Sequence, residues 1–259
     1  MPPTLTIPDL AGKRVLITGA STGIGAAVAR AFGAQRASVA IHYHSSEDAA
    51  RNVAAEVVAA GGKAVVVHGD VSDARVAGRI VAEAAAALGG LDGLINNAGS
   101  MLGRLPTAEI TDGHYDAVMN LNARSVLATI RMSVAHLRKS GSGFIINTTS
   151  VAARNGGGGG AVLYAAAKGF VSTLTRGLAK ELIGSGIRVN GVAPGVIDTA
   201  FHERDSNADQ MRGMIATIPL GKVGTSEDCA GAYLFLASPI LSGYIVGQII
   251  EVNGGQLMP

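Results

Sequence analysis

Residues 15–25 read VLITGASTGIG, and this stretch decides the fold. The aliphatic run Val15 to Ile17 predicts a strand, and a helical pattern begins at Ile24. Gly19, Gly23 and Gly25 follow the strand in the spacing G-x-x-x-G-x-G, and the last of them lies at the start of the helical pattern. Because glycine permits tight turns and close backbone approach, the stretch predicts a strand, a glycine-rich turn and a helix in direct succession.

The same alternation continues along all 259 residues. Short, almost continuously apolar runs predict strands at 15–17, 39–41, 64–67, 94–95, 144–146, 187–192 and 249–252. Longer segments with helical periodicity lie at 24–35, 46–60, 74–88, 115–139, 163–183 and 227–236. This β-α-β-α order predicts a single-domain α/β fold: a Rossmann-like, doubly wound, seven-stranded parallel sheet with helices on both faces.

Composition excludes several classes of protein. With 48% hydrophobic and 15% charged residues, and a mean hydropathy of +0.34, the chain is not intrinsically disordered. The net charge of +2 is dispersed, which argues against nucleic acid as a partner. Cys229 is the single cysteine, and no Cys/His spacing indicates a metal site. Neither a signal peptide nor a membrane-spanning run is visible, so we expect a soluble, cytoplasmic protein.

The glycine-rich turn has a chemical use beyond its geometry. At the start of a helix, unpaired N–H groups point outward and favour an anion such as a pyrophosphate, which bare glycines allow to approach closely. The turn therefore favours a dinucleotide site over an ordinary glycine-rich connection, but it does not decide the matter alone.

Further polar motifs follow the predicted strands. Asn96-Asn97-Ala98-Gly99 follows the fourth strand, Ser150 follows the fifth, and Tyr164 and Lys168 lie in the next helix. In an open parallel sheet, ligands bind at the carboxyl ends of the strands, where all these residues are expected. With these motifs the chain resembles the short-chain dehydrogenase/reductase family over essentially its whole length. Its further marks are Asp70-Val71, Asn122, Pro194-Gly195 and Asn253-Gly254-Gly255.

The spacing of Tyr164 and Lys168 supports acid–base chemistry. Residues four apart share one face of a helix, so the ammonium can lie near the phenol. A nearby cation favours the phenolate, and we therefore expect the pKa of Tyr164 to fall towards the working pH. Tyr164 would then act as general acid or base, while Ser150 hydrogen-bonds the reacting oxygen. A chance pairing of Tyr and Lys is the alternative when the other motifs are disregarded.

The resemblance implies further roles. Lys168 would also hold the nicotinamide ribose hydroxyls, and Asn122 would fix a water that relays protons from Lys168. Asn120 competes with Asn122 for that role, and Thr149 is a weaker candidate than Ser150. The implied cofactor contacts are Gly19, Ser21, Thr22, Gly23, Ile24, Gly25, Tyr43, His44, Ser45, Asp70, Val71, Asn97, Ala98, Gly99, Tyr164, Lys168, Pro194, Gly195, Ile197 and Thr199.

The segment after the second predicted strand bears on the choice of cofactor. It reads His42-Tyr43-His44-Ser45-Ser46 and holds no acidic residue before Glu47. An acidic residue here would bind the ribose of NAD and repel a 2′-phosphate, whereas hydroxyls and a histidine suit the phosphate. NADP is favoured and NAD stays an alternative, because Thr22 stands where many NADP-using relatives carry a basic residue.

The sequence thus predicts an NAD(P)H-dependent carbonyl reductase that also runs as an alcohol dehydrogenase on a small molecule. A β-ketoacyl carrier-protein reductase, a sugar or polyol dehydrogenase, and a catalytically silent nicotinamide-binding sensor are the alternatives. We expect substrate contacts from residues 100–105, 154–162 and 196–214, with 196–220 acting as a substrate lid. The family implies a homotetramer, a dimer of dimers, paired through the helices at 115–139 and 163–183.

Arg36 departs from the family pattern. Relatives usually carry glycine here, between the first helix and the second strand, where a left-handed residue ends a helix most easily. We therefore expect Arg36 to be strained or the turn to be rearranged.

Overall fold

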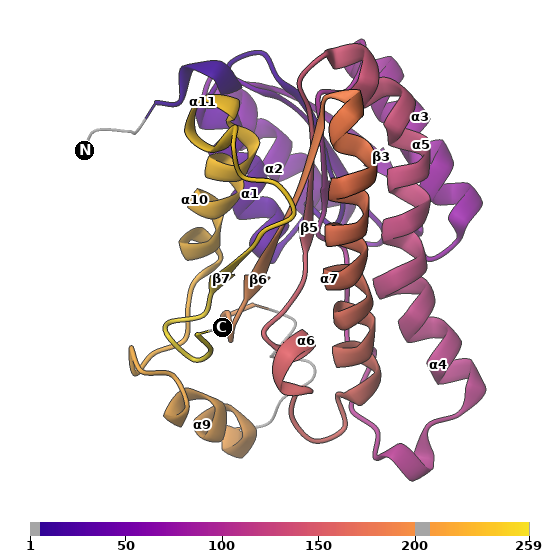
Figure 1. Cartoon of the computed structure of the whole chain (residues 1–259), viewed down its shortest axis with the longest axis vertical. Coiled ribbons are helices and arrows are strands. Elements are labelled where there is room, and N and C mark those ends of the chain that lie inside the picture. The colour runs from indigo at the N-terminus through magenta and orange to yellow at the C-terminus, as the bar shows by residue number, and fades with distance from the viewer. Residues whose placement is uncertain (1–5, 200–207, 259) are drawn as a thin grey trace.

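A computed structural model describes residues 6–199 and 208–258. Its strands form one parallel sheet in the order β3-β2-β1-β4-β5-β6-β7 (Figure 1). The strands are β1 (Arg14–Ile17), β2 (Ser38–Tyr43), β3 (Lys63–His68), β4 (Gly93–Asn96), β5 (Gly143–Thr148), β6 (Ile187–Pro194) and β7 (Ile249–Val252). The sequence prediction of a seven-stranded parallel sheet in a single domain is confirmed.

Helices cover both faces of this sheet. One face carries α1 (Gly23–Ala34), α2 (Glu47–Ala59) and α10 (Ser226–Ala237), and the other carries α3 (Ala74–Leu88), α5 (Ser125–Ser140) and α7 (Val162–Leu182) (Figure 1). The remaining helices are α4 (Asp112–Met119), α6 (Ala152–Asn155), α9 (Ala208–Ala216) and α11 (Pro239–Ser242). No helix within the described ranges combines the length and apolarity needed to cross a lipid bilayer.

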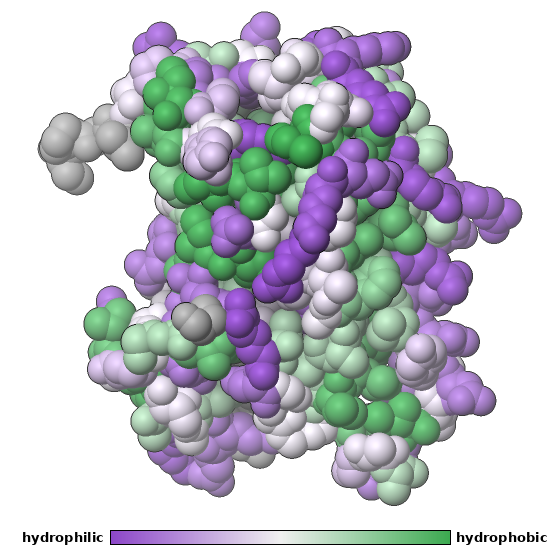
Figure 2. Space-filling model, in the orientation of Figure 1, coloured by the Kyte–Doolittle hydropathy of each residue, from purple (hydrophilic) through white to green (hydrophobic). Residues whose placement is uncertain are grey.

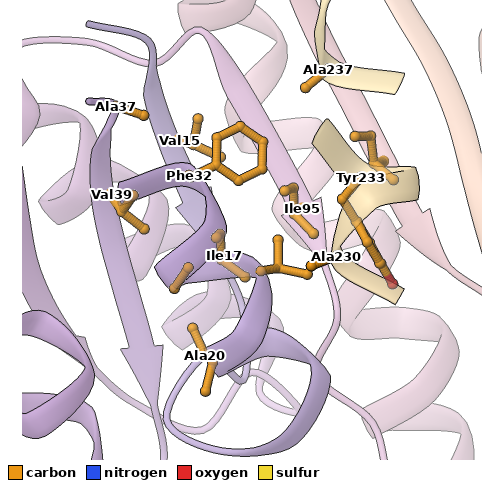
Figure 3. Close-up of a cluster of buried hydrophobic side chains, with 14 of the residues drawn as sticks. Val15, Ile17, Ala20, Phe32, Ala37, Val39, Ile95, Ala230, Tyr233 and Ala237 are labelled. Atoms are coloured by element: carbon orange, nitrogen blue, oxygen red, sulfur yellow. The ribbon is translucent and has the colours of Figure 1, made fainter. Parts of the chain in front are cut away.

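Buried apolar side chains, most of them aliphatic, fill both interfaces between the sheet and its helices. Figure 3 shows Val15 and Ile17 of β1, Phe32 of α1 and Tyr233 of α10 packed together. Phe32 also stacks on Phe144, with 6.4 Å between the ring centroids. Because residues on these strands are buried from both sides, the runs in the sequence are continuously apolar rather than alternating.

The helix expected at 115–139 is interrupted. Between α4 and α5 the chain makes a π-helical turn, η3 (Asn120–Arg124). The turn contains Asn122, whose side-chain amide donates to the Val118 carbonyl one turn earlier at 2.9 Å. Such π-bulges often lie at functional sites, because the extra residue redirects one side chain. Periodicity alone predicted one continuous helix, which is wrong at this turn.

All strands point their carboxyl ends at one edge of the sheet. The short helix α6, the helix α9 and the C-terminal segment gather beside that edge (Figure 1). Of the lid expected at 196–220, residues 200–207 lie outside the described residues. The described end of this segment is fixed to the C-terminal segment, since the Leu220 N–H donates to the Gly254 carbonyl at 3.1 Å.

Arg36 lies in the left-handed region at φ 60°, as expected from its departure from glycine. A non-glycine residue there costs about 1–2 kcal/mol. Arg36→Gly is therefore expected to raise the free energy of unfolding by about 1 kcal/mol, measured by urea denaturation. The control is Ala34→Gly at the exposed end of α1, which should lower it by about 0.5–1 kcal/mol. If the free energy of unfolding of Arg36→Gly were unchanged or lower, Arg36 would not be strained in the native protein.

Candidate functional site

A cavity of about 790 Å³ opens at the carboxyl edge of the sheet. Its walls come from the turn after β1, the ends of β2 and β3, the loops after β4 and β5, α7, the loop after β6, α9 and the C-terminal segment. The cavity therefore lies where a doubly wound sheet binds its ligands.

The glycine-rich turn forms one end of this cavity. Gly19 and Gly23 have φ of 62° and 55°, which glycine adopts without strain. A Cβ on Gly19 would stand 2.9 Å from the Cα of Ala98, so the two strand-end loops pack backbone to backbone. Thr22 precedes α1 and makes no side-chain capping bond, which leaves the N–H groups of the first turn facing the cavity end. This cradle fits a dinucleotide pyrophosphate.

Two side chains hold the glycine-rich turn in place. The Asn97 amide donates to the carbonyls of Thr18 and Gly19, each at 3.0 Å. His42 accepts from the Gly19 N–H at Nδ1, at 2.9 Å, while its Nε2 lies 2.9 Å from the Gly69 carbonyl. This pattern requires the neutral tautomer with hydrogen on Nε2. Burial lowers the pKa of His42, which keeps the ring neutral.

His42 has a clearer structural role than the sequence suggested. It is a polar residue directly after the apolar run Val39 to Ile41, and that change was the available signal. The ring is buried in the cavity wall and bonds to two loops at once.

The loop after β2 meets the cavity with His44, Ser45 and Ser46. Tyr43 does not line it, because its ring packs against His68 with the ring centroids 5.0 Å apart. Glu47 is also absent from the cavity wall and binds the Arg51 guanidinium, with Oε1 2.6 Å from Nη2. That ion pair lowers the pKa of Glu47. The polar groups presented by this loop are thus hydroxyls and an imidazole.

Ser150, Tyr164 and Lys168 converge at the middle of the cavity. The Ser150 hydroxyl and the Tyr164 phenol share a hydrogen bond. Lys168 Nζ lies 5.7 Å from the centroid of the Tyr164 ring and donates to the Thr148 carbonyl at 2.9 Å. By contrast, the Thr149 hydroxyl donates to the Val192 carbonyl of β6 at 3.3 Å. The Ser150 and Tyr164 hydroxyls can therefore act on one reacting oxygen, with the Lys168 ammonium beside the phenol ring.

Asn122 lies behind this group rather than in the cavity wall. Its amide accepts from the Ser100 N–H at 3.1 Å and donates to the Ser100 carbonyl at 2.8 Å. A Cβ on Gly99 would stand 2.7 Å from Asn122 Oδ1 and 3.2 Å from Lys168 Nζ. Asn122 and Lys168 therefore approach each other across Gly99, and the space between them leaves no room for a side chain at this position. Asn120 is not among the residues that line the cavity.

Burial dominates the ionisation of the central pair. It raises the pKa of Tyr164 to about 12, with the Ser150 hydrogen bond opposing the shift. It also lowers the pKa of Lys168 to about 8. The expectation that the ammonium lowers the tyrosine pKa is therefore wrong for the protein alone, because loss of water around the phenolate outweighs any attraction to Lys168.

The structure brings most of the predicted site residues together around this cavity. Those in its wall are Gly19, Ser21, Thr22, Gly23, Ile24, His44, Ser45, Asp70, Val71, Asn97, Ala98, Gly99, Ser150, Tyr164, Lys168, Pro194, Gly195, Ile197 and Thr199. Gly25, Tyr43 and Asn122 lie outside it. A Cβ on Gly25 would stand 2.3 Å from the Gly19 carbonyl oxygen, so this glycine shapes the turn from behind.

The sequence reasoning missed Gln256. Gln256 belongs to the C-terminal segment and lines the cavity. Its amide donates to the Thr217 hydroxyl at 2.8 Å, which ties the C-terminal segment to the end of the expected lid. The signal available was that the segment directly follows β7 and so emerges at the same edge as the other loops.

Comparisons with known proteins agree with this arrangement. A family described as enoyl-(acyl carrier protein) reductase matches residues 19–256. The chain is 37% identical to the 3-oxoacyl-[acyl-carrier-protein] reductase of Synechocystis sp. over 253 residues, covering 96% of this chain and 98% of that protein.

Solved structures resemble the chain equally closely. The NADH-dependent reductase A1-R′ complexed with NAD matches with a TM-score of 0.88 and 38% identity, covering 97% of this chain and 99% of that one. A short-chain dehydrogenase from Burkholderia cenocepacia in complex with NADP matches with a TM-score of 0.89 and 34% identity, covering 96% and 99%. The chain thus belongs to the short-chain dehydrogenase/reductase family of NAD(P)-linked oxidoreductases.

Proposed function

We propose that the protein is an NADPH-preferring carbonyl reductase, acting on a ketone or, in reverse, on a secondary alcohol. The observation that carries this proposal is the convergence of Ser150, Tyr164 and Lys168 in one cavity with the glycine cradle. The bound nicotinamide supplies or accepts a hydride. The name of the cyanobacterial 3-oxoacyl relative supports a ketone as the group reduced.

The side chains divide the remaining work. Tyr164 donates the proton to the carbonyl oxygen as negative charge develops there. Ser150 hydrogen-bonds the same oxygen and stabilises that charge. Lys168 holds the cofactor ribose. Its ammonium and the Asn122 amide oxygen both lie close to Gly99. Asn122 positions the backbone of Ser100 through two hydrogen bonds.

The raised pKa of Tyr164 fits its proposed role as proton donor in reduction. At about 12, the phenol is protonated throughout the neutral range and is ready to donate. Alcohol oxidation needs the phenolate as base, which burial disfavours. Reduction is therefore the direction in which the resting ionisation state of the site is already correct.

The NADPH preference rests on the loop after β2. His44, Ser45 and Ser46 face the cavity, and these groups can bind a phosphate. The nearest carboxylate in the sequence, Glu47, is turned to Arg51 and does not line the cavity to receive the ribose hydroxyls of NAD. Related structures hold either cofactor, so this loop is the basis for the proposed choice.

We also propose that residues 196–220 close over the substrate and that the chain assembles as a homotetramer, a dimer of dimers. Exposed apolar side chains on the helices expected to pair support this assembly, among them Tyr115, Met132 and Phe170. A second apolar surface lies over the α11 end, where Ile240 and Leu241 are exposed (Figure 2). Paired subunits would cover both surfaces.

The test is cofactor oxidation against a panel of ketones, aldehydes, β-keto esters and a trans-2-enoyl thioester, with NADPH and NADH compared at equal concentration. We expect carbonyl-dependent turnover, with kcat/KM about tenfold or more higher for NADPH than for NADH. If the enoyl thioester were the one compound of the panel that is turned over, the group reduced would be an alkene and not a ketone. Cofactor binding without turnover of any compound would favour a silent nicotinamide-binding sensor.

A further inference from the structure

The glycine tract, residues 156–160, lies on the connection between the two hydroxyls assigned to the reacting oxygen. Ser150 precedes α6, the tract follows α6, and Tyr164 lies in the first turn of α7. The tract residues that line the same cavity as these hydroxyls are Gly157, Gly158 and Gly159. A substituent on a carbonyl held by Ser150 and Tyr164 can therefore extend towards the tract.

Hydrogen bonds hold the tract in one shape. The Gly158 carbonyl accepts from the Ala161 N–H at 3.0 Å. The Gly159 carbonyl accepts from Arg104 Nη1, also at 3.0 Å. The tract is thus a formed wall of the cavity. Because these two carbonyls are already bonded within the protein, Gly158 and Gly159 present mainly methylene groups to a ligand.

Backbone conformation requires glycine at some positions of the tract and not at others. The left-handed residues are Gly156, Gly157 and Gly160, with φ of 80°, 76° and 74°. Gly158 and Gly159 do not adopt this conformation. A Cβ on Gly158 would meet its nearest neighbour at 3.5 Å, an ordinary contact, and no described residue lies within 4 Å of a Cβ on Gly159. Neither the turn nor the packing explains glycine at these two positions, where it increases the entropy lost on folding.

Apolar side chains lie next to the tract and to the two hydroxyls. Val151 and Ala152 directly follow Ser150, and Ala161 precedes α7; all three line the cavity. Leu102 also lines it and keeps 44% of its surface exposed. A substituent that covers such a surface is stabilised by leaving water, and the gain grows with its apolar area.

Building on the proposed carbonyl reductase function, we propose that the substrates are ketones with a bulky, apolar, ring-sized substituent, and that Gly158 and Gly159 lack side chains to admit it. The ring would lie against the glycine tract while the carbonyl oxygen is bonded by Ser150 and Tyr164. The two glycines would thereby determine substrate size without taking part in proton transfer.

The test compares methyl ketones of similar intrinsic reactivity. Each carries a methylene on the other side of the carbonyl, followed by a methyl group, a cyclohexyl ring or a fused two-ring decalin. With NADPH, wild-type kcat/KM should be about tenfold or more higher for at least one ring ketone than for the methyl compound, because the ring buries more apolar surface. Gly159→Leu should lower this ring-to-methyl ratio by about tenfold or more, and Gly159→Ala by a smaller factor.

Gly184→Leu is the matched control. Gly184 lies in the 3₁₀ turn η4 (Ile183–Ser185) before β6, does not line the cavity and has no described residue within 4 Å of an added Cβ. Its ring-to-methyl ratio should equal that of the wild type. Titration with NADPH verifies that each variant is folded.

The proposal is overturned if the wild type favours neither ring ketone over the methyl compound. It is also overturned if Gly159→Leu slows ring and methyl ketones equally, as a purely structural residue would. These outcomes differ from failure of the proposed function. A protein that reduces ketones without favouring a ring contradicts the bulky substrate alone, whereas a protein that reduces no ketone of any kind lacks the carbonyl reductase activity itself.

Discussion

Tyr164→Phe is expected to lower kcat/KM for ketone reduction by about 10³-fold or more, with the affinity for NADPH unchanged within about threefold. The change removes one oxygen from a buried ring and leaves its volume in place. That oxygen shares a hydrogen bond with Ser150 in the cavity wall and is the proton donor in the proposed reaction. Steady-state kinetics and fluorescence titration of NADPH measure the two quantities separately.

A matched variant distinguishes this loss from a general effect of removing a phenol oxygen. Tyr115 is exposed on α4 and does not line the cavity, so Tyr115→Phe should keep wild-type kinetics. A Tyr164→Phe protein that reduced ketones normally would show that the proton comes from another group.

Gly25→Ala has the second large expected effect, on cofactor binding and stability together. The added Cβ would stand 2.3 Å from the Gly19 carbonyl oxygen, 2.5 Å from Asn97 Nδ2 and 3.0 Å from the Ala20 Cα. Two of these atoms belong to backbone, which has little room to move. We expect the free energy of unfolding to fall by about 1–3 kcal/mol and the Kd for NADPH to rise by about tenfold or more.

Gly231→Ala provides the control for this substitution. Gly231 is exposed in α10, and nothing lies within 4 Å of its added Cβ. Alanine there should raise the free energy of unfolding by about 0.5–1 kcal/mol through helix propensity, with an unchanged Kd. Denaturant titration and cofactor titration check both proteins. Wild-type cofactor affinity in Gly25→Ala would mean that the turn is less tightly packed than described.

The strands were predictable because burial on both faces of the sheet requires a recognisable run of apolar residues. A strand covered on both faces needs apolar residues throughout, as in the Val15 to Ile17 run. Since all strands run in parallel, each motif that follows a strand reaches the same edge. Ser150, Asn97 and Gly99 could therefore be placed together without any knowledge of distances.

Features that depend on contacts between distant segments were less predictable. At the π-helical turn, the side-chain amide of Asn122 hydrogen-bonds the backbone of Ser100, 22 residues away. Helical periodicity carries no information about such a contact. Tyr43 follows the apolar run of β2, but the pleat turns its ring to His68 and away from the cavity. Arg36 is the opposite case, because the glycine that the family usually carries at this position indicated a left-handed conformation, which Arg36 adopts.

The ionisation of Tyr164 shows why motif spacing does not determine chemistry alone. The separation from Lys168 gave the correct helix face, and Lys168 Nζ indeed lies 5.7 Å from the ring centroid. Spacing carries no information about how much water reaches the two groups, and burial decides the direction of both pKa shifts. The same burial keeps the phenol protonated, which suits proton donation to a carbonyl.

Isotope transfer tests the central claim most directly. The wild-type protein would reduce a ketone from the panel with NADPH deuterated at one face of nicotinamide C4, and then at the other face. We expect one deuterium on the carbinol carbon of the product from one face and none from the other, measured by mass spectrometry and NMR. A product alcohol without deuterium from either face, or deuterium on a former alkene carbon, would contradict hydride transfer to a carbonyl in this cavity.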